Sequence, residues 1–363
     1  MSADTSVQTV NQSTLAAQIV RLGRELGFAD VGIADINLSA EAHGFQAWIA
    51  AGWHGDMEYM ARHGEKRWRP DELEPGTQSV ICVLLDYLST DTEQAEANLA
   101  NGERAYVSRY AVGRDYHKVL RNRLQRFADA INERIARHEF RVFTDSAPVL
   151  EIPLAVKAGL GWRGKHTLLL NRDRGSLFFL GEIYTSLSLS AAPATQTEHC
   201  GSCSACIDIC PTRAIVAPHR LDARRCVSYL TIEHKGAIPI EFRRAIGNRV
   251  YGCDDCQLVC PWNKFAKRAA TPDFQARHSL DDISLVALFD WDEAQFLSHT
   301  EGSAIRRIGH ERWLRNIAVA LGNAPTTQAI IDALRARQHH ASALVREHVE
   351  WALTQHTSPA PDA

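Results

Sequence analysis

The sequence predicts three parts: an α/β domain over residues 1–190, a cysteine-rich segment over 191–275 and an all-helical region over 276–363. Three observations support this division. Helical and strand patterns alternate through residue 190, which is typical of an α/β domain with a mixed sheet. Eight of the nine cysteines lie within 200–260. Beyond residue 280 the apolar residues recur at helical spacing, which predicts helices only.

The first elements of the α/β domain are a helix and two strands. Apolar residues at helical spacing predict a helix over 14–27, with Gly27 as its stop. A short strand is expected over 30–34. Residues 79–87 are almost continuously apolar, as in a strand buried on both faces. Cys82 lies in this run, so we interpret it as a buried strand residue and not as a ninth metal ligand.

The alternation continues to the end of this domain. The expected elements are a helix over 115–138, a strand over 140–144, a helix over 149–158, a glycine-rich turn over 159–165, and strands over 167–171 and 176–187. The small, polar stretch 191–199 is expected to be a linker. The C-terminal region is expected to stack short helices in a HEAT-like manner, although its units are too few to show a repeat period.

Composition excludes several classes of protein. The formal net charge is −3 with histidine neutral, so the chain lacks the basic field of a nucleic-acid coat protein. The chain contains no run of about 18 apolar residues, so the sequence does not predict a membrane span. The polar N-terminus lacks a basic segment followed by an apolar one, so we expect no export signal. A tight group of cysteines in such a chain indicates metal ligation in a reducing compartment.

The spacing of the cysteines is that of a two-cluster ferredoxin. The run from Cys200 to Cys210 reads Cys-x2-Cys-x2-Cys-x3-Cys-Pro, and the run from Cys253 to Cys260 repeats it with one cysteine fewer. Cys226, between the runs, restores the count to eight. In two-cluster ferredoxins the cysteine before proline ligates the other cluster. This pattern predicts two [4Fe–4S] clusters. Four-cysteine zinc sites use similar spacings but explain neither the proline nor the partial repeat.

The same rule predicts which cysteines share a cluster. The ligands expected for the first cluster are Cys200, Cys203, Cys206 and Cys260. The ligands expected for the second are Cys210, Cys226, Cys253 and Cys256. Such crossed ligation brings the two clusters close enough for fast electron exchange. Because clusters carry single electrons, the substrate chemistry must occur at another group.

Asp145 is the candidate for that chemistry. It follows the strand 140–144, at the end of a strand where α/β sites gather. One interpretation is a helix N-cap, which aspartate serves well. The other is a partly desolvated carboxyl group that holds a proton near neutral pH and acts as a general acid. No Gly-x-Gly-x-x-Gly fingerprint follows a strand, so a flavin or nicotinamide site is unsupported. Residues 115–117 partly match a cobalamin-histidine motif, but Leu120 replaces its glycine, and we expect them to open the long helix.

Two basic groups are candidates for RNA contact. Residues 104–126 contain seven arginines and lysines with interleaved tyrosines, and Arg306, Arg307, Arg312 and Arg315 surround Trp313. Cations beside aromatic rings suit phosphate contact and stacking on unpaired bases. Taken alone, each group is better explained as a solvated helix face.

Several stretches together strongly resemble the epoxyqueuosine reductase family, from about residue 15 to 355. They are HGDMEYM at 54–60, YVSRY at 106–110, GRDYHK at 113–118, DSAP at 145–148, KAGLGW at 157–162, RCVSYLT at 225–231, GNRVYGCDDC at 247–256 and IAVALGN at 317–323. The resemblance implies a corrinoid-binding α/β domain, a two-cluster ferredoxin-like domain and a HEAT-like region. It also implies a cytoplasmic oxidoreductase that forms queuosine from epoxyqueuosine at the tRNA wobble position.

The resemblance further implies cofactors and site residues. Electrons would pass from two [4Fe–4S] clusters to base-off cobalamin, and Asp145 falls on the family's proton donor. Corrinoid contacts are expected at Arg67, Ser108, Asp145, Leu169, Leu180 and Ser228. The expected partners are a tRNA anticodon loop and a low-potential electron donor that the sequence does not identify, with the protein a monomer. Two alternatives remain: a corrinoid-dependent reductase of another small substrate, similar to reductive dehalogenases, and a two-cluster electron-transfer protein.

Overall fold

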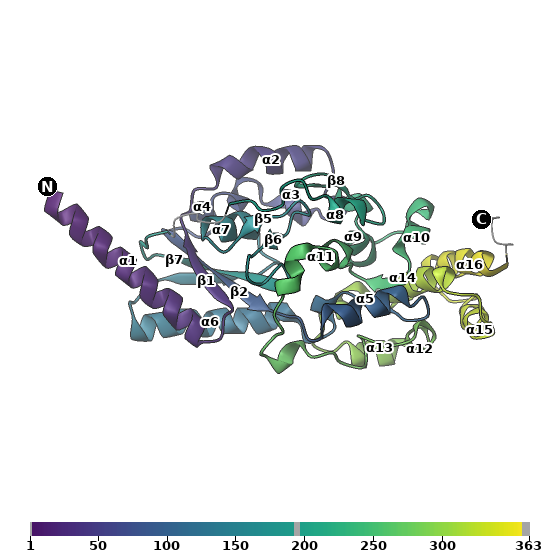
Figure 1. Ribbon diagram of the computed structural model, residues 1–363. Coiled ribbons are helices and arrows are strands. Elements are labelled where there is room, and N and C mark those ends of the chain that lie inside the picture. Colours follow the sequence, from purple (N-terminus) through teal and green to yellow (C-terminus); the bar gives the residue numbers. More distant parts are fainter. Residues whose placement is uncertain (1, 192–196, 358–363) are drawn as a thin grey trace.

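A four-stranded sheet forms the centre of the N-terminal part of the computed structural model, which describes residues 2–191 and 197–357 (Figure 1). Its strands are β1 (Asp30–Ala34), β2 (Ser79–Asp86), β4 (Phe140–Phe143) and β7 (Phe178–Thr185), in the order β1-β2-β7-β4. All neighbouring pairs are antiparallel; Cys82, for example, lies opposite Glu182. The expected mixed sheet was therefore wrong, because alternation along the chain does not reveal which strands pair.

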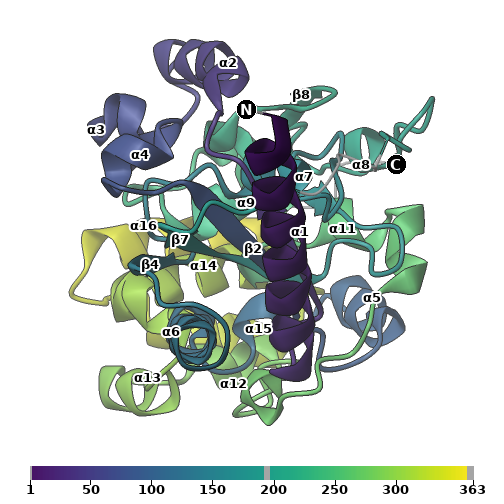
Figure 2. The same cartoon turned by 90° about the vertical axis from the view of Figure 1, so that its left-hand side faces the viewer.

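Helices cover both faces of this sheet (Figure 2). On one face, α1 (Ser2–Glu25) and α6 (Tyr116–Arg134) pack Ile19 and Leu124 against Val83 and other strand residues. On the other face, α7 (Glu151–Lys157) packs Leu154 against a second cluster that contains the buried Cys82. The predicted identity of Cys82 as a buried strand residue is thus confirmed.

The ends of the two long helices follow from their capping residues. Gly27 has a φ of 87°, and its N–H donates to the carbonyl of Arg24 at 3.0 Å, which ends α1 as predicted. Helix α1 begins earlier than the apolar pattern indicated. Asp115 caps α6, because its carboxylate accepts the backbone N–H of His117 at 3.2 Å. Residues 115–117 therefore open the long helix, as expected.

The remaining elements are short. Around the sheet lie α2 (Ser39–Ala50), α3 (Tyr59–Arg62), α4 (Pro70–Leu73), α5 (Thr92–Ala100), β3 (Tyr106–Val107), β5 (Trp162–Arg163) and β6 (Leu169–Leu170). The cysteine segment contains α8 (Ala205–Asp208), β8 (Ile215–Ala217), β9 (Arg220–Leu221), α9 (Val227–Ile232), α10 (Ile240–Ile246), β10 (Arg249–Tyr251) and α11 (Asp255–Leu258). Short 3₁₀ helices are η1 (Gly64–Arg67), η2 (Arg109–Ala111), η3 (Ala223–Arg225), η4 (Pro261–Phe265), η5 (Pro272–Phe274) and η6 (Ala304–Ile308).

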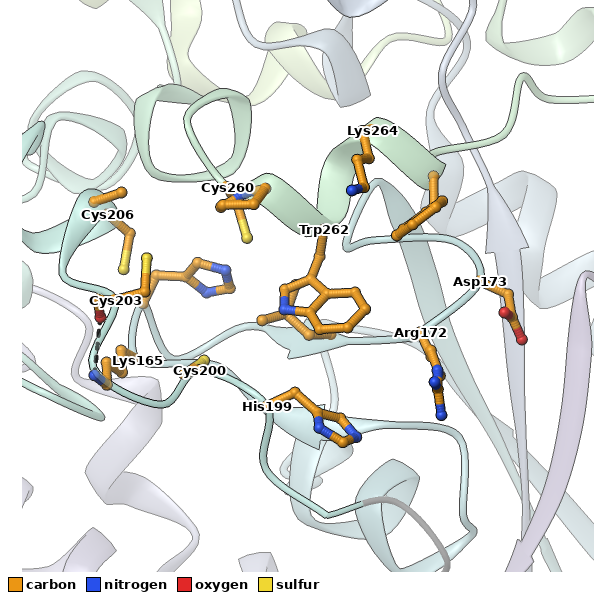
Figure 3. Close-up of a pocket in the computed structure, with 15 residues that line it drawn as sticks. Lys165, Arg172, Asp173, His199, Cys200, Cys203, Cys206, Cys260, Trp262 and Lys264 are labelled. Carbon is orange, nitrogen blue, oxygen red and sulfur yellow. Dashed lines mark hydrogen bonds between the residues drawn. The ribbon is translucent and has the colours of Figure 1, made fainter.

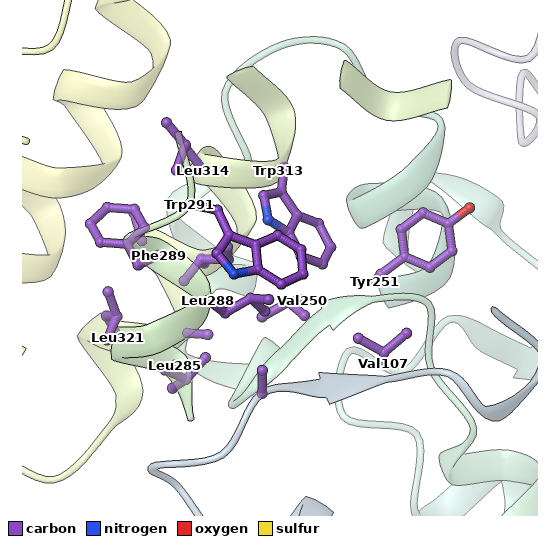
Figure 4. Packing of buried hydrophobic residues seen from close by; sticks show 14 of the residues in the cluster. Val107, Val250, Tyr251, Leu285, Leu288, Phe289, Trp291, Trp313, Leu314 and Leu321 are labelled. Carbon is purple, nitrogen blue, oxygen red and sulfur yellow. The ribbon is translucent and has the colours of Figure 1, made fainter. Parts of the chain in front are cut away.

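The C-terminal region is helical, as predicted. It consists of α12 (Leu285–Phe289), α13 (Glu293–His299), α14 (Gly309–Asn323), α15 (Gln328–Ala336) and α16 (Ala343–Thr357). Its core surrounds the fully buried Trp313 and also includes Val107 and Val250, from strands that pair in parallel (Figure 4). Residues far apart in the chain thus share one core. Among the described residues, no helix has both the length and the apolar character to span a membrane.

Candidate functional site

The structure gathers the cysteines into two groups of four. Cys200, Cys203, Cys206 and Cys260 border a cavity of about 470 Å³ that reaches the protein surface (Figure 3). Cys210, Cys226, Cys253 and Cys256 border a second cavity of about 410 Å³. Each group contains cysteines from both runs. This is possible because helices α8 and α11, which each begin inside one of the runs, pack against each other.

The grouping fits a cluster better than a single metal ion. Within the described ranges, no three His, Cys, Asp or Glu side chains converge to hold a single metal ion. A [4Fe–4S] cluster is instead bound by four thiolates that surround its cubane core. The two cavities are large enough for such cores, and the donor set is the one that Fe–S clusters use.

The second cavity extends from its cysteines to Asp145. Asp145 also borders a third cavity, of about 600 Å³, whose lining includes Tyr59, Lys235 and Arg307. Tyr110, Tyr116, Leu221, Cys226 and Ser228 line both cavities as well. Asp145 therefore lies where the cavity beside the second cysteine group meets a larger one.

Asp145 is held in an unusual backbone conformation. Its φ is 48°, in the left-handed region that residues other than glycine rarely adopt and that costs about 1–3 kcal/mol. Its backbone N–H donates to Oε1 of Glu151 at 2.6 Å, in the first turn of α7. The N-cap interpretation is wrong, because α7 begins at Glu151 and the side chain of Asp145 does not cap it. Strain of this kind at a cavity indicates function.

The carboxylate of Asp145 has two hydrogen-bonding neighbours. Tyr116 donates its hydroxyl to Oδ2, and Nε2 of His117 lies 2.8 Å from the same oxygen. The other ring nitrogen of His117 lies 2.8 Å from Oδ1 of Asp115. Burial acts to lower the pKa of His117, but the two carboxylates outweigh it and raise that pKa above its usual value. The two carboxylates therefore favour the form of His117 with a proton on each nitrogen, in which the ring donates to both aspartates, whereas Arg307, whose Nη2 lies 3.0 Å from Nε2, opposes it.

These contacts correct one expectation about Asp145. Desolvation acts to raise its pKa, but the hydrogen bond and charge of His117, the hydrogen bond from Tyr116 and the charge of Arg307 hold the pKa below its usual range. Its side chain is 51% exposed, because it faces the cavities. The free protein thus has an ionised Asp145 at neutral pH, and not the protonated Asp145 that the sequence indicated.

Two further carboxyl groups behind Asp145 do hold protons. Burial, together with the charge of Asp145, raises the pKa of Glu151 to about 8. Glu182, in the middle of β7, is fully buried, and neither of its carboxyl oxygens has a hydrogen-bond partner in the part of the chain that the structure describes. Burial and the charges of Glu151 and Asp145 raise the pKa of Glu182 well above its usual value.

Glu182 predicts a dependence of stability on pH. Because the folded protein keeps this proton while the unfolded chain releases it above its ordinary pKa of 4.5, stability falls as pH rises, by about 1.4 kcal/mol per unit at most. Glu182→Gln removes this proton linkage at almost constant shape. We expect the unfolding temperature of the variant to fall less than that of the parent between about pH 5 and about pH 8. Equal decreases in the two proteins would contradict a protonated Glu182.

Most residues predicted to contact a corrinoid line the second cavity: Ser108, Asp145, Leu169, Leu180 and Ser228. The hydroxyl of Ser108 donates to Asp254, and its backbone N–H and carbonyl are bonded to Tyr251 and Ala111, so its polar groups are already used within the protein. Arg67 is buried and lines neither of the two cavities next to Asp145. Its guanidinium donates to the carbonyls of Tyr59 (2.6 Å) and Met60 (2.8 Å), so it supports the segment that carries Tyr59.

The second cavity also has polar groups that lack partners. Thr212 Oγ1 and His166 Nε2 are buried, belong to residues that line the cavity, and have no hydrogen-bond partner in residues 2–191 and 197–357. Burial and the charge of His219 lower the pKa of His166 to about 4, so this ring is neutral. Unpaired buried polar atoms are costly, and they fit a ligand with its own amide or hydroxyl groups.

The analysis of the sequence missed several residues of this site. His117 was interpreted as part of the start of a helix, Tyr116 also as one of the tyrosines in a basic group, and Glu151 was not singled out. Arg307 was grouped with three other arginines, but only it and Arg312 line the third cavity. Arg315 is fully buried and donates to backbone carbonyls, as in a structural role. The Asp-Tyr-His stretch at the start of the long helix was the one available indication.

Comparisons with known proteins agree with this geometry. Residues 199–263 match the family model described as "4Fe-4S double cluster binding domain". Residues 67–146, which include Ser108, His117 and Asp145, match the model described as "Epoxyqueuosine reductase QueG, DUF1730". The two matched regions therefore contain the cysteine groups and the Asp145 site.

Curated relatives match along almost the whole chain. The epoxyqueuosine reductase of Pseudomonas aeruginosa is 60% identical over 342 residues, covering 94% of each chain. That of Escherichia coli is 53% identical over 348 residues, covering 96% of this chain and 91% of the relative. A crystal structure of epoxyqueuosine reductase with a tRNA-Tyr epoxyqueuosine-modified stem loop has a TM-score of 0.86 at 26% identity, covering 96% of this chain and 91% of that one. The Bacillus subtilis structure has a TM-score of 0.85 at 27% identity, with the same coverage.

Proposed function

The chain belongs to the epoxyqueuosine reductase family and is an oxidoreductase, and from this premise we propose the detailed reaction that its site carries out. It reduces epoxyqueuosine to queuosine at the wobble position of tRNA, in the cytoplasm. The observation that carries the proposal is the position of Asp145, between a cavity bordered by cysteines and an open cavity bordered by cations and aromatic rings. Loss of the epoxide oxygen as water requires two electrons and two protons.

The eight cysteines hold two [4Fe–4S] clusters by crossed ligation. The grouping around two cavities supports the assignment of Cys260 to the first cluster and of Cys210 and Cys226 to the second. The second cluster then lies on the same cavity as Asp145. Electrons would reach the reaction site from the first cluster by way of the second.

We propose base-off cobalamin as the occupant of the second cavity. Leu169, Leu180 and Phe178 offer apolar contacts, while the unpaired atoms of Thr212 and His166 suit polar groups on a corrin. Ser228 lines the passage to the third cavity. When bound, cobalamin would supply a cobalt centre that accepts low-potential electrons and transfers them to the substrate. Residues 1–190 would then form the corrinoid-binding domain, beside a HEAT-like region over 276–363.

The proton chemistry follows from the hydrogen bonds of Asp145. A carboxyl group in contact with the epoxide oxygen prevents the expulsion of a bare alkoxide, and such an acid typically contributes about 10²–10⁴-fold in rate. In its protonated form His117 donates to Asp145, so it can transfer a proton to Asp145 as negative charge develops on the oxygen. Asp115 on the other ring nitrogen keeps His117 oriented. Tyr116 fixes the direction of the carboxylate.

The third cavity is the proposed entrance for the modified base. Tyr59 is 43% exposed and suits stacking, and Arg307 and the exposed Lys235 offer cations for phosphates. Lys235→Met is expected to weaken tRNA binding and to reduce the slope of log affinity against log salt concentration by about 0.7–0.9. Binding measured at several salt concentrations tests this, with Arg335→Met as the control, because Arg335 is an exposed cation on α15 outside both basic groups. An unchanged slope would exclude Lys235 as a phosphate contact.

The reaction is tested by anaerobic turnover of epoxyqueuosine-containing tRNA, with nucleosides measured by mass spectrometry. The assay is run with a low-potential reductant, with and without added cobalamin. Queuosine that forms only with cobalamin would support the substrate, the cofactor and the reaction together. No product from protein that holds both clusters and cobalamin would contradict the proposal.

A further inference from the structure

The first cysteine group contains an exposed cysteine, Cys203, whereas all four cysteines of the second group are half-buried. Residues 201–204, including Cys203, are exposed, and the cavity bordered by this group opens between them and Trp262 (Figure 3). The second group borders the cavity that contains Asp145. An electron that arrives from outside the molecule therefore meets the first group before it reaches the second. No nucleotide-binding fingerprint in the sequence offers another entry for electrons.

Cations surround this opening. Lys165, Arg172 and Lys264 line the cavity, whereas Asp173 is the one carboxylate in its lining. This local excess of positive charge contrasts with the net charge of −3 for the whole chain. The cations differ in role: Lys165 donates to the carbonyls of Gly201 (2.6 Å) and Cys203 (2.8 Å) and thereby shapes the cysteine loop.

Arg172 and Lys264 have no such structural task. Both are exposed, and neither forms an ion pair with any residue that the structure describes. Lys264 lies over the ring of Phe265 at 4.8 Å, and this ring is itself 38% exposed. Behind it, Trp262 packs against Trp162 with ring centres 5.1 Å apart, which gives the face a rigid base. Unpaired cations around an exposed aromatic ring form a surface that complements an acidic partner.

We propose that this face, formed by Arg172, Lys264 and Phe265 around the first cysteine group, receives a small acidic one-electron carrier protein of the flavodoxin or ferredoxin class. This inference rests on the proposed assignment of the first cluster to Cys200, Cys203, Cys206 and Cys260. At each encounter the carrier is oxidised by one electron and the first cluster is reduced by one, so two encounters supply one turnover. Contacts of electron carriers are small and short-lived, and charge complementarity increases their rate of association.

The test uses the cluster-loaded protein and reduced flavodoxin as the probe, in anaerobic stopped-flow experiments without tRNA. Reduction is measured as the loss of visible absorbance of the clusters. We expect Arg172→Glu combined with Lys264→Glu to slow reduction by flavodoxin at least about tenfold at low salt, with the difference shrinking at high salt. Reduction by dithionite, which needs no docking face, should be unchanged and shows that the clusters are intact.

The matched control carries the same charge change elsewhere. Arg121→Glu combined with Arg134→Glu alters two exposed arginines on α6 and should leave the rate with flavodoxin within about twofold of the parent. Equal rates for the docking variant and the parent, or an equal loss in the control, would overturn the proposal. A docking variant that loses tRNA binding but is reduced normally would assign the face to RNA instead. The stopped-flow assay contains no tRNA, so its result does not depend on whether the protein forms queuosine.

Discussion

Asp145→Asn is expected to lower the turnover of epoxyqueuosine-containing tRNA by about 10²–10⁴-fold while both clusters remain in place. Asparagine has the same shape and still accepts the hydroxyl of Tyr116. It cannot take a proton from His117 and pass it to the departing oxygen, and it removes the charge that helps to keep His117 protonated. The loss should therefore appear in kcat more than in KM.

Single-turnover assays with nucleosides measured by mass spectrometry check this expectation, together with the iron content of the variant. Asp129→Asn is a suitable control, because Asp129 is an exposed carboxylate on α6 that accepts a hydrogen bond from Gln125 of the same helix. Activity of Asp145→Asn close to that of the parent would remove Asp145 from the proton chemistry. Loss of iron in the variant would instead indicate a structural role.

Cys226→Ala is expected to abolish turnover, because it removes one of the four proposed ligands of the second cluster. Cys226 lies outside both cysteine runs, so its role follows only from the count of ligands and from its position on the cavity beside Asp145. The variant should retain about half of the iron, since the first cluster keeps all four thiolates. Iron analysis and electron paramagnetic resonance of the reduced protein measure both effects.

Cys82→Ala provides the control for this experiment, because Cys82 is a buried strand residue away from both groups. It should retain the full iron content. The crossed assignment is tested further by comparing Cys210→Ala with Cys260→Ala. Although Cys210 belongs to the first run, its loss should remove the second cluster, and the loss of Cys260 should remove the first. Full iron content in Cys226→Ala would contradict the assignment. Loss of the first cluster in Cys210→Ala together with loss of the second in Cys260→Ala would contradict it as well.

Sequence patterns predicted the local structure well where burial is periodic. Helix α6 was predicted because its buried apolar residues recur at helical spacing. Strand β2 was predicted because almost all of its side chains are apolar and buried. The pairing of the strands was not predicted correctly. Strand order and direction depend on contacts between segments far apart in the chain, and the expected mixed sheet proved to be antiparallel.

The site shows the same division. The spacing of the cysteines and the motifs around Asp145 were sufficient, from the sequence alone, to predict two clusters and the family, because ligand spacing within one loop is a local property. Only the tertiary structure decided what surrounds each functional side chain. In the folded protein Arg67 lies away from the cavity, His117 and Glu151 contact Asp145, and Asp145 is ionised. Protonation and access depend on the dielectric and the charges within a few ångströms, and those neighbours are contributed by residues that are distant along the chain.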